Sequence, residues 1–423
     1  MLSVGKEDNS TKLKLAIHNA LFDKDPYDDL AIRHLLSKLQ KLIEEIIGIM
    51  QLQSETSQIN MAYAQWLNGQ ELVQLHEQKL DSITNDTPTS LTDYYWQYQW
   101  TQEREQFATK NQVRHGNVGL QDVSIAFDKY FVVHKLKMAC AAYSLQTMYK
   151  QQFSIGFIDE ILGQYETREP TEPLILFYYL GLQTLRAKNA TQYFTRLKLT
   201  LLLPSLPIDR QERMDLFILA QNHCIRMVNS GQEEYFQELF DLYEAMLRQE
   251  LIQHDAVQFP PAFKNIVSVA LRLKAFDWVE QFITTHADYL EPTYREDYLN
   301  YNLARVYFEQ HNYDETQNCL MKVQYKDFFI GLNARMLLLK VYYELDLYDL
   351  AFSQMDSFKQ YLSRKEVMSY HKQTYQNNLK YIKRLLNLNT YDKARKKLLY
   401  DQINGEQVLT EKKWLLEKLG QFN

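Results

Sequence analysis

The sequence predicts an all-helical protein built from antiparallel helical hairpins. Three observations lead to this prediction: glycine and proline are scarce, apolar residues recur at helical spacing, and a hairpin-sized pattern repeats near the C-terminus. The 12 glycines and 9 prolines make up about 5% of the 423 residues, against roughly 12% in average proteins. Because these two residues interrupt helices, their scarcity favours long helices joined by short turns.

Helical periodicity is clearest in residues 31–47. There, apolar side chains recur three or four positions apart, which places them on one broad face of a helix. Polar clusters separate such stretches, and several end in a residue that can cap the following helix, such as Asp93 or Asp209. Alternating patterns typical of strands are absent over any useful length. We therefore expect about 18–20 helices.

A pattern repeats in the C-terminal half at a spacing of 35 residues. Residues 303–307 (LARVY), followed by 313–316 (YDET), correspond to residues 338–342 (LLKVY), followed by 348–351 (YDLA). Weaker copies of the second segment occur at residues 276–279 (FDWV) and 391–394 (YDKA). In each copy, an aromatic residue followed by Asp opens the predicted second helix of a hairpin.

This pattern resembles the tetratricopeptide repeat, a pair of antiparallel helices in about 34 residues. The resemblance implies that successive hairpins stack into an α-solenoid and bury one another's apolar faces. The sequence departs from the family pattern where Ala304 or Leu339 replaces a glycine, and where His311 or Asp346 occupies the turn. We expect a helical N-terminal domain at residues 1–168 and a tetratricopeptide-like array at 169–423, clearest at about 260–402.

Several segments also resemble a bacterial family of uncharacterised helical proteins. The shared motifs are residues 26–29 (PYDD), residues 42–45 (LIEE), Tyr94-Tyr95 with Glu103, Glu105 and Phe107, Phe131 with residues 135–140 (KLKMAC), and residues 411–418 (EKKWLLEK). They are spread along most of the chain. This resemblance implies a helical fold and a cytoplasmic location, and it supplies no catalytic residue.

Composition narrows the functional classes. The formal net charge of -6 is mild and indicates no particular partner. The N-terminal residues lack the apolar core of a signal peptide, and no run reaches the ~18 apolar residues of a membrane span. We therefore expect a cytoplasmic protein with no membrane partner. The cysteines Cys140, Cys224 and Cys319 lie far apart, without metal or disulfide spacing.

No local motif indicates catalysis. The phosphate-binding, nucleophile-elbow, zinc-protease and paired-cysteine patterns are missing, and the ten histidines are scattered. We therefore expect no enzymatic activity, cofactor, metal or small-molecule substrate. An enzyme is the third hypothesis, since catalytic groups can converge from distant helices without leaving a local motif.

Residues 94–100 (YYWQYQW) hold five aromatic side chains in seven positions. On a helix, Trp96 and Trp100 share one face, and Tyr94 and Tyr98 share another. The functional interpretation is an aromatic platform for a peptide or a base. The simpler interpretation is a helix buried between two neighbours.

The leading hypothesis is a protein-binding scaffold or adaptor. In tetratricopeptide arrays the first helices line a concave groove where partners dock, and the resemblance assigns groove positions in this chain. They are Lys264, Arg272, Tyr301, Arg305, Phe308, Met336, Lys340, Tyr343 and Lys383. Cations beside aromatic rings suit carboxylates, so we expect a protein partner that presents an acidic peptide or a chain terminus. The alternative is a set of ordinary solvated charges, balanced by Glu309 and Glu344.

The second hypothesis is binding to RNA or to a nucleoprotein. Residues 372–397 contain eight Lys or Arg and the single acid Asp392, with Tyr375, Tyr381 and Tyr391 between them. Such cations can bind phosphates while the rings stack on bases. The residues expected to carry this binding are Lys380, Arg384, Lys393, Arg395, Lys396 and Lys397. A basic, solvated face of a terminal helix is the simpler interpretation.

Overall fold

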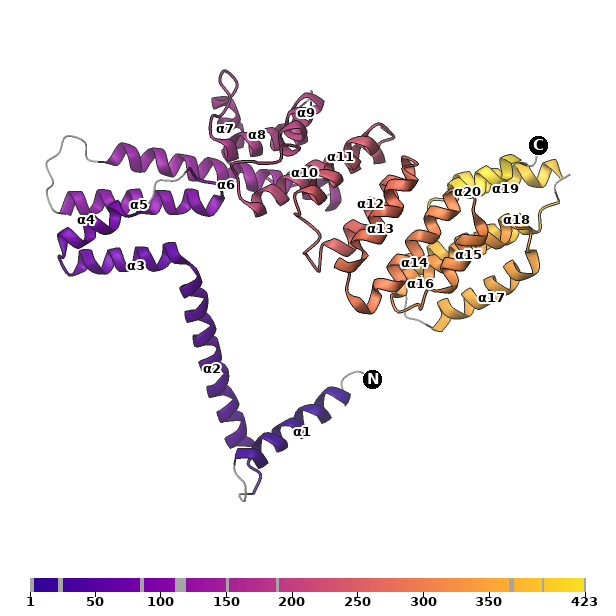
Figure 1. Ribbon diagram of the computed structural model, residues 1–423, viewed down its shortest axis with the longest axis horizontal. Coiled ribbons are helices and arrows are strands. Elements are labelled where there is room, and N and C mark those ends of the chain that lie inside the picture. The colour runs from indigo at the N-terminus through magenta and orange to yellow at the C-terminus, as the bar shows by residue number, and fades with distance from the viewer. Residues whose placement is uncertain are drawn as a thin grey trace. The chain divides into compact units, whose positions relative to one another are not determined.

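The protein is all-helical in a computed structural model (Figure 1), as its sequence predicts. The structure describes residues 4–21, 26–83, 87–110, 119–149, 152–187, 190–364, 369–389 and 392–421. Across these residues, twenty α-helices occupy 79% of the positions and no strand is present.

The chain forms two compact units. Unit 1 comprises Met1–Ala142, Gln151–Tyr179 and Pro207–Asp209, and unit 2 comprises Tyr143–Lys150, Leu180–Leu206 and Arg210–Asn423. The chain passes from one unit to the other within α6 (Leu120–Tyr149) and α8 (Pro173–Arg186). The predicted domain boundary near residue 168 falls within a segment of unit 1.

Unit 1 contains five helices before α6 and one short helix after it. Their bounds are α1 Val4–Leu21, α2 Asp29–Ser54, α3 Thr56–Gly69, α4 Val73–Asp81, α5 Leu91–Lys110 and α7 Ile158–Gln164. Asp28 is the N-cap of α2: its carboxylate accepts the backbone N–H of Leu30 at 2.8 Å and that of Ala31 at 3.1 Å.

A buried carboxylate links three helices of unit 1. Glu103 of α5 accepts a hydrogen bond from Asn68 Nδ2 of α3 at 3.1 Å, and its Oε1 lies 3.2 Å from His76 Nε2 of α4. Glu103 is 6% exposed and His76 is fully buried. The His76 ring also packs 4.1 Å from the ring of Phe107. The Glu103 carboxylate is thus paired with side chains from two other helices, which fixes how α3, α4 and α5 meet.

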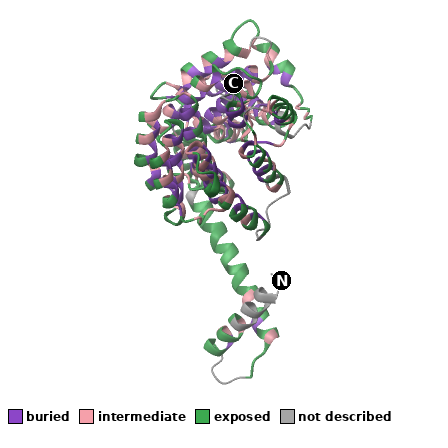
Figure 2. Ribbon diagram, turned by 90° about the vertical axis from the view of Figure 1, so that its right-hand side faces the viewer, coloured by how far each residue is buried: buried purple, intermediate pink, exposed green. Residues whose placement is uncertain are grey.

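Helix α2 exposes its apolar face. Ile32 is buried, but Leu39, Leu42, Ile43 and Ile46 are all between 46% and 55% exposed. Figure 2 shows this helix as exposed along most of its length. Among the helices described, none combines the length and the apolar character that a membrane crossing requires.

Unit 2 is a succession of helical hairpins. Its helices are α9 Ala190–Leu201, α10 Arg210–Asn229, α11 Tyr235–Arg248, α12 Phe259–Arg272, α13 Phe276–His286, α14 Pro292–Glu309, α15 Tyr313–Met321, α16 Phe328–Glu344, α17 Tyr348–Arg364, α18 Ser369–Leu386, α19 Lys393–Gly405 and α20 Lys412–Gln421. Helices α10 to α17 pack as four consecutive pairs, and each pair contacts the next (Figure 1). The first helices also touch directly, since α14 contacts both α12 and α16.

The second helices begin where the sequence pattern predicts. Helices α13, α15 and α17 start at Phe276, Tyr313 and Tyr348, the aromatic residues that precede Asp. Helix α19 starts at Lys393, and Asp392 caps it by accepting the N–H of Arg395 at 3.0 Å. Tyr391, the aromatic residue of that copy, lies outside the described residues.

Each of the four hairpins reverses at one residue in the left-handed conformation. These turn residues are Gly231, Lys274, His311 and Asp346, with φ angles of 94°, 57°, 59° and 56°. In each turn, the next amide donates to the carbonyl five positions back, as from Asn312 N to Tyr307 O at 2.9 Å. This bond satisfies a carbonyl group at the C-terminal end of the first helix, which would otherwise lack a partner within the helix. His311 and Asp346, which replace the turn glycine, therefore adopt the conformation that glycine usually provides.

A buried aspartate anchors the loop between two hairpins. Asp297 of α14 is 1% exposed. Its carboxylate accepts the backbone N–H groups of Gln324 and Lys326, both at 2.6 Å, and that of Asp327 at 3.2 Å. Asp327 in turn caps α16 through Ile330 N at 2.7 Å. The start of α16 is therefore fixed by a side chain of the preceding hairpin.

A buried histidine lies in the core of unit 2. His223 of α10 is 1% exposed, and its ring stacks on Phe194 with centroids 4.8 Å apart. Arg226 Nη2 lies 3.0 Å from His223 Nδ1, a separation that suits donation from the guanidinium to the neutral imidazole. Burial, reinforced by the charge of Arg226, lowers the pKa of His223 to about 4.

Replacing Lys274 by Gly should stabilise the protein by about 1 kcal/mol, because glycine adopts the left-handed turn without the steric cost of a Cβ atom. Urea unfolding followed by circular dichroism measures the effect. The matched control is Gln281→Gly, at an exposed position inside α13, which should lower stability by about 1 kcal/mol. Equal losses in both variants would show that the turn conformation carries no strain.

Acidification should destabilise the fold through His223. The unfolded chain binds a proton at this histidine near pH 6.5, whereas the folded chain excludes it until about pH 4. The stability that His223 contributes is complete above about pH 6.5 and declines by up to about 3 kcal/mol as the pH falls to about 4. Urea unfolding across this range should show a shallower decline for His223→Phe. The exposed-site control His34→Gln should keep the wild-type slope.

Candidate functional site

The nine predicted groove residues lie on four helices of unit 2. Lys264 and Arg272 are on α12, Tyr301, Arg305 and Phe308 on α14, Met336, Lys340 and Tyr343 on α16, and Lys383 on α18. Because α14 contacts α12 and α16, eight of them come from neighbouring first helices. Phe308, Met336 and Tyr343 are buried, so they support this face rather than present an open surface.

Lys340 holds a carboxylate of the chain itself. Its Nζ lies 2.9 Å from Glu411 Oε2, just before α20. The same ammonium is 4.7 Å from the ring centroid of Phe308 and 5.4 Å from that of Trp414. Only 12% of the Lys340 side chain is exposed. This face therefore has the chemistry to bind a carboxylate by a charge-assisted hydrogen bond between aromatic rings.

Helix α20 makes two further polar contacts with α16. Trp414 Nε1 donates to Glu344 Oε1 at 2.7 Å, and Lys418 Nζ donates to Glu344 Oε2 at 2.7 Å. The side chains of Lys418 and Glu344 are 8% and 10% exposed. Glu344, which the sequence suggested as a solvated counter-charge, is thus a largely covered partner of α20. Helix α20 covers the α16 part of the predicted groove.

The segment that leads into α20 is attached to α18. Asn378 Nδ2 donates to Thr410 Oγ1 at 2.7 Å, and Asn378 Oδ1 accepts the backbone N–H of Glu411 at 3.3 Å. Asn377 Nδ2 donates to the carbonyl of Val408 at 3.0 Å. Two asparagines of α18 therefore place the Glu411 carboxylate at Lys340.

Arg305 of α14 is held in place by a neighbouring first helix. Its Nη2 donates to Ser268 Oγ of α12 at 2.9 Å, and its Nη1 donates to Asn302 Oδ1 at 3.1 Å. The guanidinium carbon lies 5.9 Å from the Tyr301 ring centroid. Burial raises the pKa of Tyr301, with Arg305 opposing the shift, so its hydroxyl stays a donor at neutral pH.

The two cations of α12 also lie over aromatic rings. Lys264 Nζ is 5.0 Å from the ring centroid of Tyr298, and the Arg272 guanidinium is 5.5 Å from that of Phe236. Arg272 forms an ion pair with Glu233, which is 71% exposed. The pattern of a cation beside a ring is therefore present on α12, α14 and α16.

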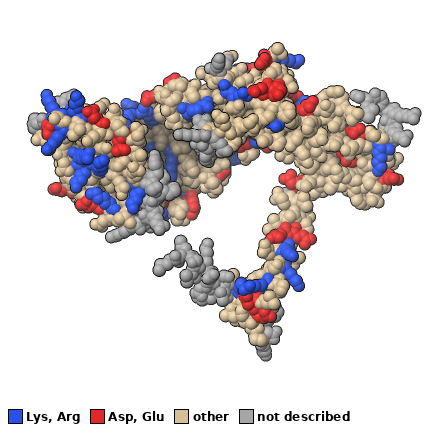
Figure 3. Space-filling view, turned by 180° about the vertical axis from the view of Figure 1, so that it is seen from behind, with Lys and Arg blue, Asp and Glu red and all other residues tan. Residues whose placement is uncertain are grey.

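The predicted basic patch lies on α18 and α19. Lys380, Lys383 and Arg384 of α18 are exposed, as are Lys393, Arg395 and Lys397 of α19, while Lys396 is partly buried. Blue side chains gather over these C-terminal helices in Figure 3. Arg384 Nη1 donates to Gln402 Oε1 at 2.5 Å, which joins the two helices. Tyr375 and Tyr381 are buried, so their rings support α18 instead of standing free for base stacking.

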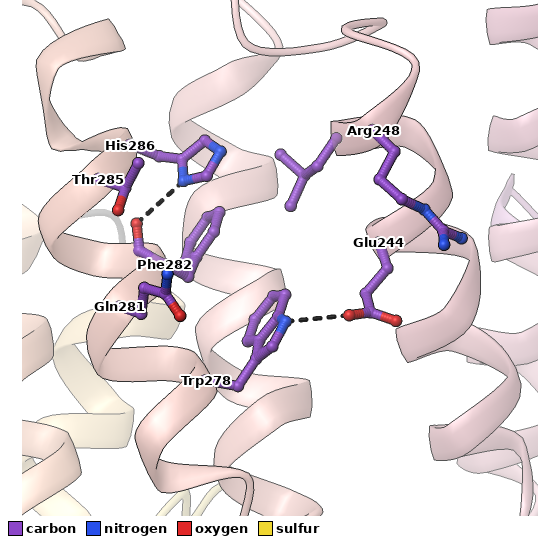
Figure 4. A pocket seen from close by; sticks show the side chains of 8 residues that line it. Glu244, Arg248, Trp278, Gln281, Phe282, Thr285 and His286 are labelled. Atoms are coloured by element: carbon purple, nitrogen blue, oxygen red, sulfur yellow. Dashed lines mark hydrogen bonds between the residues drawn. The ribbon is translucent and has the colours of Figure 1, made fainter.

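A pocket that the sequence did not suggest opens between second helices. It has a volume of about 300 Å³ and is lined by Glu244, Leu247, Arg248, Trp278, Gln281, Phe282, Thr285 and His286. In Figure 4, the aromatic side chains of α13 face Glu244 and Arg248 of α11. The Trp278 indole donates to Glu244 Oε1 at 3.0 Å. Burial lowers the pKa of His286, which leaves its ring neutral at pH 7.

The aromatic segment of α5 combines burial with partial exposure. Tyr94 is 1% exposed, as a packed helix requires. Trp96 and Trp100 are partly exposed and line a cavity of about 860 Å³ within unit 1, with Arg104 and Lys129 on its wall. Four-residue spacing placed these two indoles on one face, but only the packing of α5 shows that this face borders a cavity.

Comparisons with known proteins assign this chain to no family. No family model matches it, and neither a curated protein nor a solved structure does. Across the described ranges, no three or more His, Cys, Asp or Glu side chains are grouped to hold a metal ion. Cys140, Cys224 and Cys319 are buried free thiols. Function is therefore inferred from the residues and their geometry.

Replacing Glu411 by Gln should loosen α20. The substitution leaves Lys340 partly buried without its counter-charge, at a cost of about 1–3 kcal/mol. Hydrogen–deuterium exchange should show the amides of α20 exchanging about tenfold faster or more. Glu417→Gln, at an exposed position on the same helix, is the control and should leave exchange unchanged. Equal protection in both variants would mean that apolar packing alone holds α20.

Proposed function

We propose that the protein is a non-enzymatic adaptor that binds an acidic segment or chain terminus of another protein. Binding would occur along the concave face of an α-solenoid of tetratricopeptide-like hairpins. The observation that carries this proposal is the engagement of Glu411 by Lys340 between the rings of Phe308 and Trp414. The chain itself thus provides an example of the interaction that we propose for the partner.

Two features support the repeat architecture. Consecutive pairs from α10 to α17 contact their neighbours, which is the connectivity of stacked hairpins. All four pairs reverse through the same left-handed turn, as at His311 and Asp346. In such arrays the first helices present a continuous surface with no chemistry of its own, which suits binding more than catalysis.

The face formed by α12 and α14 supports the choice of an acidic partner. Lys264 and Arg305 lie there beside aromatic rings of α14, as Lys340 lies beside Phe308, and Arg272 of α12 lies over Phe236 of α11. Arg305 is already oriented by Ser268 and Asn302. Binding a carboxylate there therefore costs less side-chain conformational entropy. The partly buried Tyr301 supplies a neutral hydroxyl donor next to this guanidinium.

Charge reversal on this face should abolish binding of acidic peptides. We would titrate the protein into a fluorescent peptide that ends in several glutamates and a free carboxylate, and follow its anisotropy. The Lys264→Glu, Arg305→Glu double variant should bind at least about tenfold more weakly, since two attractive contacts become repulsive. A peptide with glutamines and an amidated end is the ligand control. Equal binding of the two peptides, or wild-type affinity of the variant, would contradict the proposal.

The alternative function is RNA binding by the basic patch, and one observation favours it. Lys393, Arg395 and Lys397 are exposed in the first turns of α19, where the helix dipole disfavours positive charge. Residues that are unfavourable for local stability, such as cations at a helix N-terminus, often have a functional role. The triple variant Lys393→Glu, Lys396→Glu, Lys397→Glu therefore serves as the protein control for the peptide titration. If RNA is the ligand, this variant alone should lose affinity for a single-stranded oligonucleotide and show a weaker salt dependence.

A further inference from the structure

The apolar face of α2 offers an interaction surface that the adaptor function does not use. Leu39, Leu42, Ile43 and Ile46 lie in the middle of this helix and are each about half exposed, while Ile49 and Met50 extend the same face at 48% and 64% exposed. A continuous apolar face formed by six exposed side chains rarely remains in contact with water. Such a face usually binds another protein or a membrane.

The spacing of these residues is that of a coiled coil. Leu35, Leu42 and Ile49 are seven residues apart, and so are Leu36, Ile43 and Met50. Leu39 and Ile46 form a third row at the same interval. We call these eight residues the α2 seam. A strict seven-residue repeat keeps an apolar seam facing one partner helix, whereas a helix that lies on a globular core follows a period near 3.6.

The charges of α2 are divided along its length. Arg33, Lys38 and Lys41 occupy the N-terminal and central turns, and Glu44 and Glu45 follow them. With Asp29, the helix carries three acids and three bases. A membrane-binding amphipathic helix would carry a strongly basic polar face instead. A helix whose first half carries a net positive charge and whose second half is acidic is complementary to an antiparallel copy of itself.

We propose that α2 pairs with α2 of a second copy of this chain in an antiparallel coiled coil. The twofold axis passes between Gln40 and Lys41. Leu39 then packs against the partner's Leu42, and Leu35 packs against the partner's Ile46. The interface is isologous, since each contact occurs twice by symmetry.

The same register joins opposite charges. With Leu39 against the partner's Leu42, Lys38 flanks the seam beside the partner's Glu45, and Glu45 lies beside the partner's Lys38. On the other flank, Leu36 meets the partner's Ile43. In a parallel, in-register pair, the basic half of one helix would lie along the basic half of the other. The charges therefore select the antiparallel arrangement.

The mass of the full-length protein in solution tests the pairing. Light scattering at tens of micromolar protein should give twice the chain mass of 50.4 kDa. Ile46→Glu, which places a charge in the seam, should give the single-chain mass with unchanged circular dichroism, because Ile46 is 54% exposed. Gly48→Glu is the control on the opposite side of α2, where an added Cβ meets open space, and it should remain dimeric.

Charge exchange tests the orientation. Lys38→Glu and Glu45→Lys should each weaken the dimer by about three- to tenfold, because each turns two attractive pairs into repulsive ones. The double variant should recover the wild-type dissociation constant. In a parallel pair these side chains do not meet, and neither single variant would have this effect.

The proposal is overturned if the wild type has the mass of one chain, or if Ile46→Glu remains dimeric. A single chain that binds anionic vesicles through α2 would likewise replace the second copy with a lipid surface. Because none of these readouts involves acidic peptides, the dimer and the adaptor function can fail independently.

Discussion

The left-handed residue at the end of each first helix is the constraint on which unit 2 depends. A helix can reverse within two or three residues only if one of them leaves the right-handed region and its neighbour's amide satisfies a terminal carbonyl. Gly231 does so without cost, whereas Lys274, His311 and Asp346 do so against the preference of a residue with a Cβ atom. Burial of the apolar faces of each hairpin offsets this local strain. Once the turns are set, the second helix of each pair can only run back along the first.

Folding and binding use the same chemistry on the first-helix face. On α16, Lys340 and Glu344 are paired with side chains of α20 and of the residue before it, and only 12% and 10% of their side chains are exposed. On α12 and α14, similar cations lie beside aromatic rings, and Arg305 is already oriented by α12. At one end of the face these residue types contribute to stability, whereas at the other end we propose that they bind a partner. This division explains why the same residue types can be structural in one hairpin and candidates for recognition in the next.

Much of the fold followed from local sequence patterns. Scarce breakers and helical periodicity predicted the all-helical class, and the aromatic–Asp pairs located the starts of α13, α15 and α17. These features depend on residues a few positions apart, which is the range over which pattern is informative. The packing of α20 on α16 was not predictable, because Glu411 and Lys340 are separated by 71 residues and no motif links them.

Part of the candidate sites could also be predicted from the sequence, and part could not. The register of the repeats placed Lys264, Arg305 and Lys340 on neighbouring helices, which the contacts of α14 support. The pocket beside Trp278 was missed, since its residues come from second helices, to which the pattern assigned no function. The apolar stripe of α2 was recognised, but its exposure was not, because periodicity shows that a face is apolar and leaves open what covers it.

The attachment of α20 has a mechanical consequence. A pull on the C-terminus would load the side-chain contacts of Glu411, Trp414 and Lys418 before it reached the backbone hydrogen bonds of any hairpin. Glu411 lies just before α20 and the other two lie in its first two turns, so these contacts would be loaded together, along with the packing of α20 on α18 and α19. Tension could thus uncover Lys340 while the hairpins that carry it stay folded.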